Sequence, residues 1–291
     1  MILLDGKTVA AEIRNQLKAE IAALRHDAGR PPALCVILVG ENPASQVYVR
    51  NKHKACQECG IISETITPPA SVKQHDLMEI IEELNRRPEI DGILLQLPLP
   101  AGLNSDACLA LISPEKDVDG FNPISMGRLA LGLPGFRPCT PAGIMTLLDY
   151  YGLSVKYKKS VVLGRSNIVG RPLSIMLSAH GDKADSTVTL CHSKTPDLAA
   201  ECLQADFLFA AIGRPRFITK DMVKPGAVVI DVGINRTEQG LVGDVDFENL
   251  KDIASAMTPA PGGIGPMTIA QLLRNTVLSL RLKLERDKLN A

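Results

Sequence analysis

Residues 161–172 read VVLGRSNIVGRP, which is the pattern of a buried strand, a glycine turn and the start of a helix. In this context, backbone N–H groups at the helix N-terminus bind the pyrophosphate of a dinucleotide. The common spacing G-x-G-x-x-G is replaced here by Gly164, Ser166 and Gly170, so the motif alone also fits an ordinary strand–helix turn.

The next strand favours NADP over NAD as the coenzyme. Sites for NAD carry an Asp or Glu at the end of the second strand, where it binds the ribose 2′-hydroxyl. Here the apolar run 188–191 is followed by HSKTP at 192–196, with no carboxylate before Asp197. Arg165, Ser193 and the lysine of this segment would suit a 2′-phosphate, which needs positive charge and donors. The same segment also fits a solvated loop that caps the next helix.

The rest of the second half alternates between strand-like and helix-like segments. Each apolar run but the last precedes a plausible helix, and the strands are expected at 160–163, 187–191, 207–211 and 227–232. A final helix after residue 266 carries an apolar stripe, and the residue pattern leaves open which lobe covers it.

The first half shows the same alternation, which predicts parallel strands with covering helices. Helices are expected at 8–25, 44–59, 72–87 and 104–112, and strands at 33–39, 61–66 and 92–97. From residue 117 to 141 the periodicity fades while glycine and proline accumulate, which indicates a crossing between two lobes. The expected fold class is therefore α/β with two lobes, the second of them Rossmann-like with a parallel sheet.

Length and composition describe a globular chain without a general attraction to polyanions. The 291 residues exceed one ordinary core, and 45% of them are hydrophobic. Lys plus Arg and Asp plus Glu both total 32, so the net charge of zero argues against nucleic acid or a membrane as a partner. The sequence shows neither a secretory apolar region nor a run of roughly 18 apolar residues, so we expect a cytoplasmic protein.

The seven cysteines are expected to be reduced and buried, because they are odd in number and scattered along a chain that can build a core. Only Cys56 and Cys59 show a C-x-x-C spacing, and a zinc site would need two further ligands that nothing nearby supplies. We therefore predict no metal site.

Tyr48 and Lys52 are candidate reacting groups of the first half. They lie at i and i+4 in the helix expected at 44–59, so both side chains project from one face. Burial can draw the pKa of a lysine toward neutrality, where the amine accepts a proton or activates a water. Tyrosine and lysine one turn apart are also common as surface decoration.

Two further polar features lie near strand ends. Gln96 interrupts an apolar run near the carboxyl end of a strand, and a buried amide there needs either a ligand or neighbouring backbone as partner. Asp117 and Asp119 lie in the segment KDVDGFNP at 116–123. A carboxylate there is suited to accept hydrogen bonds from a ring N–H and an exocyclic amino group, or it belongs only to a turn.

Two glycine turns in the second half are also candidates for ligand binding. The segment IDVGIN at 230–235 is a strand that ends in a glycine turn. The segment TPAPGGIGPMT at 258–268 combines stiff prolines with glycines that let a ligand approach the backbone, although it also fits a connector into the last helix.

Taken in order, six of these segments resemble the bifunctional methylenetetrahydrofolate dehydrogenase/methenyltetrahydrofolate cyclohydrolase family. They are YVRNKHKA at 48–55, QLPLP at 96–100, KDVDGF at 116–121, PCTP at 138–141, GRSNIVGRP at 164–172 and PGGIGPMT at 261–268. Six matched segments in the family's order are far more specific than any one of them.

The resemblance implies an NADP-dependent oxidation of 5,10-methylenetetrahydrofolate to 5,10-methenyltetrahydrofolate and its hydrolysis to 10-formyltetrahydrofolate. It also implies a homodimer with tetrahydrofolate derivatives as substrates and a cleft between the lobes. Residues 1–140, joined by a returning C-terminal helix at 268–291, would form the folate-binding catalytic domain, and residues 141–267 would bind NADP.

The resemblance also assigns roles to single residues. Lys52 would be the main catalytic residue of hydrolysis, with Tyr48 shaping the folate pocket and Gln96 influencing the protonation of Lys52. Asp119 would complete this catalytic group by holding the pterin ring. The other folate contacts would be Leu95, Leu97, Pro259, Pro261, Gly262 and Gly263, and the coenzyme contacts would be Gly164, Arg165, Ser166, Ser193 and Ile234.

Two other classes of protein fit parts of the pattern. A different NADP dehydrogenase, acting on an amino acid or a shikimate-like acid, would need charged residues near the motifs to grip a carboxylate, and these are scarce. A nucleotide-binding regulatory module without chemistry would have no use for Tyr48, Lys52, Gln96 and Asp119 together.

Overall fold

The computed structural model describes residues 1–238 and 240–290 of the chain. The chain forms two compact units, of which unit 1 comprises Met1–Ala10 and Pro138–Thr268, and unit 2 comprises Ala11–Arg137 and Ile269–Ala291. Each unit contains a parallel sheet with helices, so the α/β class expected from the sequence is confirmed.

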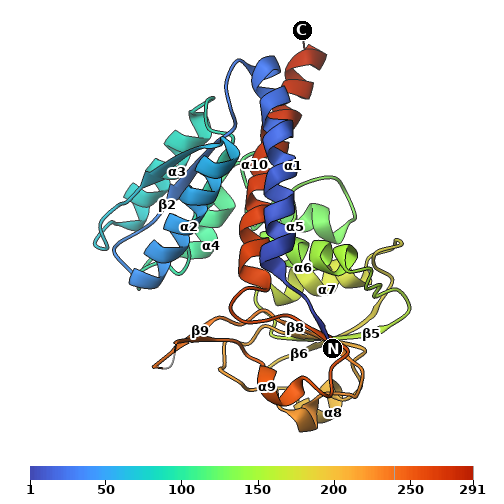
Figure 1. Cartoon of the computed structure of the whole chain (residues 1–291). Coiled ribbons are helices and arrows are strands. Elements are labelled where there is room, and N and C mark those ends of the chain that lie inside the picture. Colours follow the sequence, from blue (N-terminus) through green and yellow to red (C-terminus); the bar gives the residue numbers. More distant parts are fainter. Residues whose placement is uncertain (239, 291) are drawn as a thin grey trace. The chain divides into compact units, whose positions relative to one another are not determined.

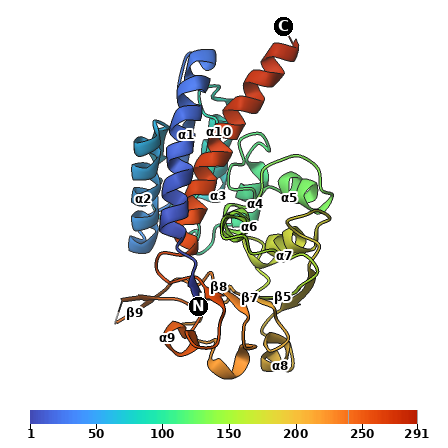
Figure 2. The same ribbon diagram turned by 45° about the vertical axis from the view of Figure 1, so that its right-hand side comes forward.

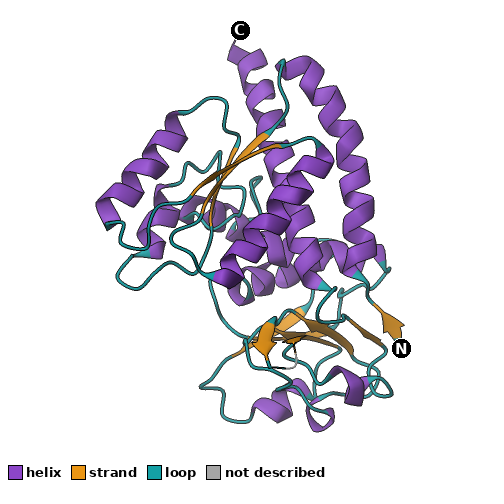
Figure 3. Ribbon diagram, turned by 60° about the vertical axis from the view of Figure 1, so that its left-hand side comes forward, coloured by secondary structure: helices purple, strands orange, loops and turns teal. Residues whose placement is uncertain are grey.

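The sheet of unit 2 has the strand order β3, β2, β4. The middle strand β2 (Ala33–Ile37) and its neighbour β4 (Gly92–Leu95) are buried at every residue, whereas β3 (Ile62–Ile66) is partly exposed. Parallel neighbours need crossover connections, and the helices α2 (Pro43–Cys59) and α3 (Gln74–Arg86) supply them. Figure 3 shows these strands in orange with helices beside them.

Two long helices, α1 (Gly6–Ala28) and α10 (Ile264–Asn290), lie side by side in Figures 1 and 2. Arg281 forms an ion pair with Glu20, and Lys288 Nζ lies 3.7 Å from Asp27 Oδ2, so ion pairs link the C-terminal halves of the two helices.

Polar side chains of α10 form hydrogen bonds with loops of unit 2. Ser279 Oγ lies 2.6 Å from the carbonyl oxygen of Asp91 and 2.8 Å from that of Glu115. Asn275 Nδ2 donates a hydrogen bond to the carbonyl of Val118 at 2.8 Å. From Ile269 onward, the C-terminal helix therefore packs within unit 2.

Within the described residues, the sheet of unit 1 has six strands, each parallel to its neighbours. Their order is β1 (Ile2–Leu3), β11 (Ala256–Met257), β8 (Val228–Asp231), β7 (Phe207–Ala210), β5 (Lys159–Leu163) and β6 (Thr187–Cys191). The direction of strand addition reverses at β5, because β6 lies on one side and β7 and β8 on the other. Ligands bind at the carboxyl ends of strands beside such a reversal.

The helices of unit 1 cover its sheet in Figures 1 and 2. They are α6 (Cys139–Tyr150), α7 (Gly170–Ser178), α8 (Leu198–Cys202) and α9 (Phe247–Leu250). Leu163, Leu208 and Val229 are fully buried in the core beneath the sheet, together with Cys202 of α8. This core fixes the strand ends from which the site is built.

Three expectations about single elements were wrong. Helices α5 (Pro123–Ala130) and α6 begin inside the stretch expected to be irregular. Asn122 caps α5 by accepting a hydrogen bond from Ile124 N, so an Asn-Pro pair that resembles a loop is in fact a helix start. After β7, only a 3-10 turn (Lys220–Met222) stands in place of the expected helix.

The N-terminal segment joins unit 1. Ile2 and Leu3 pair with β11, whereas the sequence placed residues 1–140 in the other lobe. A strand of two residues is too short to show a periodicity, so the pattern could not reveal it. The two-domain assignment of function stays a prediction.

The described cysteines are all buried free thiols, as the sequence predicted. Burial raises the pKa of Cys35, Cys56 and Cys202 to about 12, so these thiols stay protonated at neutral pH. None of the described helices combines the length and the apolar character needed to cross a bilayer.

Candidate active site

Tyr48 and Lys52 are placed by α2, and local sequence fixes both ends of this helix. The Asn42 side chain accepts hydrogen bonds from two backbone N–H groups of the first turn, and Gly60 ends the helix with a left-handed φ of 83°. Tyr48 is 37% exposed, whereas Lys52 is only 8% exposed. Lysine is rarely buried, so Lys52 is not surface decoration.

Lys52 contacts Gln96 directly. Gln96 follows β4, and its backbone N–H donates to the carbonyl of Ile37 at 2.9 Å. Its side-chain Nε2 donates to the carbonyl of Leu97 at 2.8 Å, which leaves Oε1 to accept a hydrogen bond from Lys52 Nζ at 2.9 Å. The amide of Gln96, which carries no net charge, therefore positions the amine of Lys52.

The two leucines on either side of Gln96 belong to the core of unit 2. Leu95 is 2% exposed, and Leu97 is partly buried against the same cluster. The side chain of Leu95 is therefore part of the core.

The acidic loop before α5 is shaped by Asp117. This buried carboxylate accepts hydrogen bonds from the backbone N–H groups of Gly120, Phe121 and Asn122 at 2.8–3.1 Å. Burial raises the pKa of Asp117 to about 6, and its effect outweighs that of the hydrogen bonds to the carboxylate, which lower the pKa. Asp117 thus has a structural role in the loop, and Asp119 lies two residues further on in a half-buried position.

In unit 1, close backbone contacts explain the glycine spacing after β5. Gly164 has a φ of 105°, and a Cβ there would overlap the carbonyl oxygen of Ala211. A Cβ at Gly170 would overlap the carbonyl oxygen of Gly164. The second glycine therefore lets α7 approach the turn, although the motif departs from the common spacing.

A pocket of about 330 Å³ lies at the carboxyl ends of β5, β6 and β7. Four of the five predicted coenzyme contacts line it, namely Gly164, Arg165, Ser166 and Ser193. Lys194, the lysine of the segment HSKTP that the sequence also suggested for the 2′-phosphate, is not among the lining residues in the described part of the chain. Sequence reasoning missed Ala211, Ile212, Arg214 and Phe217, which follow β7 and also line the pocket.

The fifth predicted coenzyme contact, Ile234, lies in a smaller pocket. The loop after β8 and residues 259–265 line this pocket, so Ile234 is brought together with Pro259, Pro261, Gly262 and Gly263. The carbonyl of Gly262 accepts a hydrogen bond from Lys7 N at 3.1 Å, and that of Pro259 accepts one from Gly263 N at 2.8 Å. The Ala260–Pro261 peptide bond is cis.

Asp231 holds this pocket together, and sequence reasoning missed it. Its carboxylate is 3% exposed and accepts hydrogen bonds from the backbone N–H groups of Gly233, Asp244 and Val245 at 2.9–3.0 Å. Its own N–H donates to Thr258 Oγ1 at 2.7 Å. The aspartate in the IDVGIN segment was visible, but the distant partners that give it a role were not.

The pH dependence of stability is expected to report on Asp231. Burial raises its pKa from 3.8 to about 7, with the nearby Asp244 carboxylate acting in the same direction. The folded chain therefore keeps a proton on Asp231 that the unfolded chain loses. The contribution of this proton to the free energy of unfolding is complete below pH 4 and is lost as the pH rises to 7. Between pH 5 and 7 the loss is about 2 kcal/mol.

Urea unfolding at the two pH values measures this contribution. The wild type should lose more free energy of unfolding between pH 5 and 7 than Asp231→Asn, which cannot titrate. Equal losses in the two proteins would show that Asp231 has an ordinary pKa.

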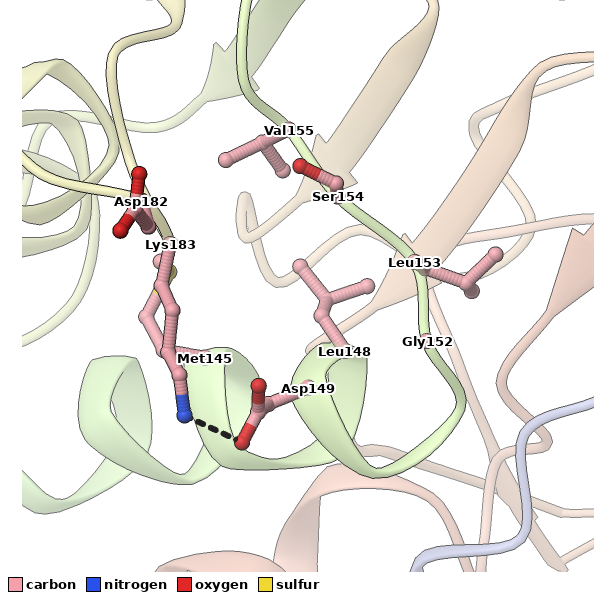
Figure 4. A pocket seen from close by; sticks show the side chains of 9 residues that line it. All are labelled: Met145, Leu148, Asp149, Gly152, Leu153, Ser154, Val155, Asp182 and Lys183. Carbon is pink, nitrogen blue, oxygen red and sulfur yellow. Dashed lines mark hydrogen bonds and ion pairs between the residues drawn. The ribbon is translucent and has the colours of Figure 1, made fainter.

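Another pocket, of about 160 Å³, contains none of the predicted site residues. Figure 4 shows Lys183 reaching from one wall to Asp149 of α6, and these two form an ion pair at 2.6 Å. Leu153 and Val155 line the pocket just before β5 begins. It lies at the amino edge of the sheet, whereas ligands of parallel sheets bind at the carboxyl edge.

Comparison with known proteins matches both parts of the chain to one family. The NAD(P)-binding domain of tetrahydrofolate dehydrogenase/cyclohydrolase matches residues 138–284. The catalytic domain of the same family matches residues 4–119.

Individual relatives cover almost the whole chain. The bifunctional protein FolD of Oleidesulfovibrio alaskensis is 67% identical over 279 residues, which are 96% of this chain and 98% of that protein. The crystal structure of the bifunctional enzyme FolD from Campylobacter jejuni has a TM-score of 0.93 at 48% identity, covering 97% and 99% of the two chains. The Trypanosoma brucei enzyme, complexed with NADP cofactor and inhibitor, has a TM-score of 0.91 at 36% identity, covering 97% and 98%.

Proposed function

The chain belongs to the tetrahydrofolate dehydrogenase/cyclohydrolase family, and on this basis we propose roles for its residues in two reactions. The protein oxidises 5,10-methylenetetrahydrofolate to 5,10-methenyltetrahydrofolate with NADP, and hydrolyses the product to 10-formyltetrahydrofolate. The hydrogen bond from buried Lys52 to neutral Gln96 is the observation that best supports the hydrolytic role.

The residues of unit 1 fit NADP. The pocket of about 330 Å³ is within the usual size of a ligand site. Gly164 lines it, and the close backbone approach there leaves no room for a Cβ at Gly164 or at Gly170 behind it. Arg165 and Ser193 would hold the 2′-phosphate, with Ser166 and Ile234 as further contacts. When bound, NADP accepts the hydride of the folate methylene carbon.

The protein's main task in the oxidation is positioning. The nitrogens on either side of the reacting carbon stabilise the cation that hydride loss leaves, so no side chain must do so. Asp119 would bind the pterin by accepting hydrogen bonds from the ring N–H and the amino group of the pterin. Leu95, Leu97 and the loop formed by Pro259, Pro261, Gly262 and Gly263 would line the folate site.

Hydrolysis needs a base, and Lys52 supplies one. Water adds to the amidinium-like carbon and must lose a proton, which a neutral amine can accept. Gln96 would hold Nζ in place and influence its protonation through the 2.9 Å hydrogen bond. Burial raises the pKa of Tyr48, so its phenol stays protonated and can shape the folate pocket as a donor.

Two separate assays test the function. One follows NADP reduction with 5,10-methylenetetrahydrofolate, and the other follows loss of 5,10-methenyltetrahydrofolate absorbance without coenzyme. Both rates should depend on the enzyme concentration. A chain that performed neither reaction would contradict the proposal.

Asp119→Asn is expected to raise the KM for folate about 10- to 100-fold in both reactions, because a charge-assisted hydrogen bond is lost. Steady-state kinetics of the two reactions measure the change. Asp106→Asn, which alters an exposed carboxylate of α4 (Ser105–Leu111), is the matched control and should leave the KM unchanged. An unchanged KM in Asp119→Asn would remove Asp119 from the folate site.

We also propose that the protein is a cytoplasmic homodimer. The free thiols of the described cysteines support a reducing compartment. Light scattering on the purified protein should give twice the mass of one chain, and the mass of one chain would contradict the dimer.

A further inference from the structure

The loop that follows β7 brings a second guanidinium to the coenzyme pocket. Arg214 lines this pocket together with Arg165, His192 and Ser193, and none of the described lining residues is a carboxylate. The pocket wall therefore carries two permanent positive charges and no opposing negative charge.

Arg214 is held by an aromatic platform. Its guanidinium carbon lies 4.3 Å from the centre of the Phe217 ring. Phe217 is itself packed against the buried core of unit 1, so the platform cannot move freely. Stacking uses the flat face of the guanidinium and leaves the N–H groups at its edges able to bind an anion.

Hydrogen bonds fix the backbone on both sides of Arg214. The backbone N–H groups of Ile212 and Gly213 donate to Asp244 Oδ2 at 2.7 and 2.9 Å. After Arg214, the N–H of Arg216 donates to the carbonyl of Gly243 at 3.0 Å. Arg214 thus starts from an anchored loop, so less conformational entropy is lost when it binds a ligand.

We propose that Arg214 is a second arginine for the 2′-phosphate of NADP, acting with Arg165 and Ser193 to set the preference for NADP over NAD. The inference rests on the proposed use of NADP by this pocket. A dianionic phosphate can accept hydrogen bonds from two guanidinium groups at once, whereas the 2′-hydroxyl of NAD offers no charge for them.

The test compares two fragments of the coenzyme. Adenosine 2′,5′-bisphosphate contains the 2′-phosphate, and 5′-AMP lacks it. Isothermal titration calorimetry on the full chain should show that Arg214→Gln weakens the bisphosphate about 10- to 30-fold, while 5′-AMP changes less than about twofold. In kinetics, the KM for NADP should rise with little change in kcat.

Arg216→Gln is the matched control, because it removes the same charge two residues further along the chain. The side chain of Arg216 is not among the described residues that line the pocket. It should leave both fragments within about twofold. Phe217→Leu keeps an apolar contact but removes the ring, and should weaken the bisphosphate about threefold. Circular dichroism checks that each variant is folded.

Four results would overturn the role of Arg214. Equal weakening of both fragments by Arg214→Gln would mean that Arg214 stacks on adenine. Equal weakening of the bisphosphate by Arg214→Gln and Arg216→Gln would mean that only the overall positive charge of this loop matters. Unchanged binding in Arg214→Gln, with weakening in Arg165→Gln, would restrict the phosphate site to Arg165. If the wild type itself bound the bisphosphate no better than 5′-AMP, the proposed NADP site would fail as well.

Discussion

Replacing Lys52 by methionine is expected to abolish the cyclohydrolase reaction while most of the dehydrogenase reaction remains. A positioned general base contributes about 10²- to 10⁴-fold, so the hydrolytic rate should fall by at least about 100-fold. Methionine is similar in length and tolerates burial, and Lys52 is already 8% exposed, so packing should survive. The oxidation requires no base at this position and should continue.

The control for this variant is Lys54→Met. Lys54 lies on the same helix, but its side chain is 76% exposed, so its loss should alter neither reaction. Loss of both reactions in folded Lys52→Met would mean that Lys52 mainly positions the substrate. Retention of both would remove it from the chemistry.

Gly170→Ala is expected to weaken NADP binding strongly and to destabilise unit 1. The added Cβ would overlap the carbonyl oxygen of Gly164, and this atom is backbone that cannot swing away. Relieving the overlap must separate α7 from the glycine turn, at an expected loss of about 2–3 kcal/mol of unfolding free energy. For a chain of this length, this corresponds to a fall in Tm of roughly 3–5 °C.

Calorimetric unfolding and NADP titration measure the two effects. Gly127→Ala is the control, because Gly127 lies inside α5 and an added Cβ meets no atom within 4 Å. That variant should be stabilised by about 0.5–1 kcal/mol, since alanine loses less entropy than glycine in a helix. A Gly170→Ala protein with unchanged Tm and NADP affinity would show that the turn does not need the close approach.

The alternation of strands and helices was predictable because each element has its own hydrophobic period. The glycine turn after β5 was also predictable, since a strand, a turn and a helix start are all local patterns. Helix α5 was not, because Asn and Pro are favoured in turns as well as at helix starts, so Asn122 and Pro123 fit both. In the structure, the hydrogen bond from Ile124 N to the Asn122 side chain marks a helix start.

The candidate site was predictable where a motif spans it and not where the fold assembles it. Gln96 and Lys52 are 44 residues apart, and the resemblance linked them before the structure showed the contact. Arg214 lies in a loop without a periodic pattern, and it reaches the pocket only because β7 pairs with β5. Asp231 gains its role from Asp244, 13 residues further on, and no spacing rule predicts that partner.

The most direct measurement of whether both reactions run on this chain is one absorbance time course. The enzyme is mixed with 5,10-methylenetetrahydrofolate and NADP, and NADPH and methenyl-folate are followed together, with Lys52→Met alongside. We predict that NADPH accumulates while methenyl-folate stays low, and that methenyl-folate builds up only in the variant. Build-up of methenyl-folate in step with NADPH in the wild type would contradict the cyclohydrolase role of Lys52, and absence of both products would contradict the folate assignment.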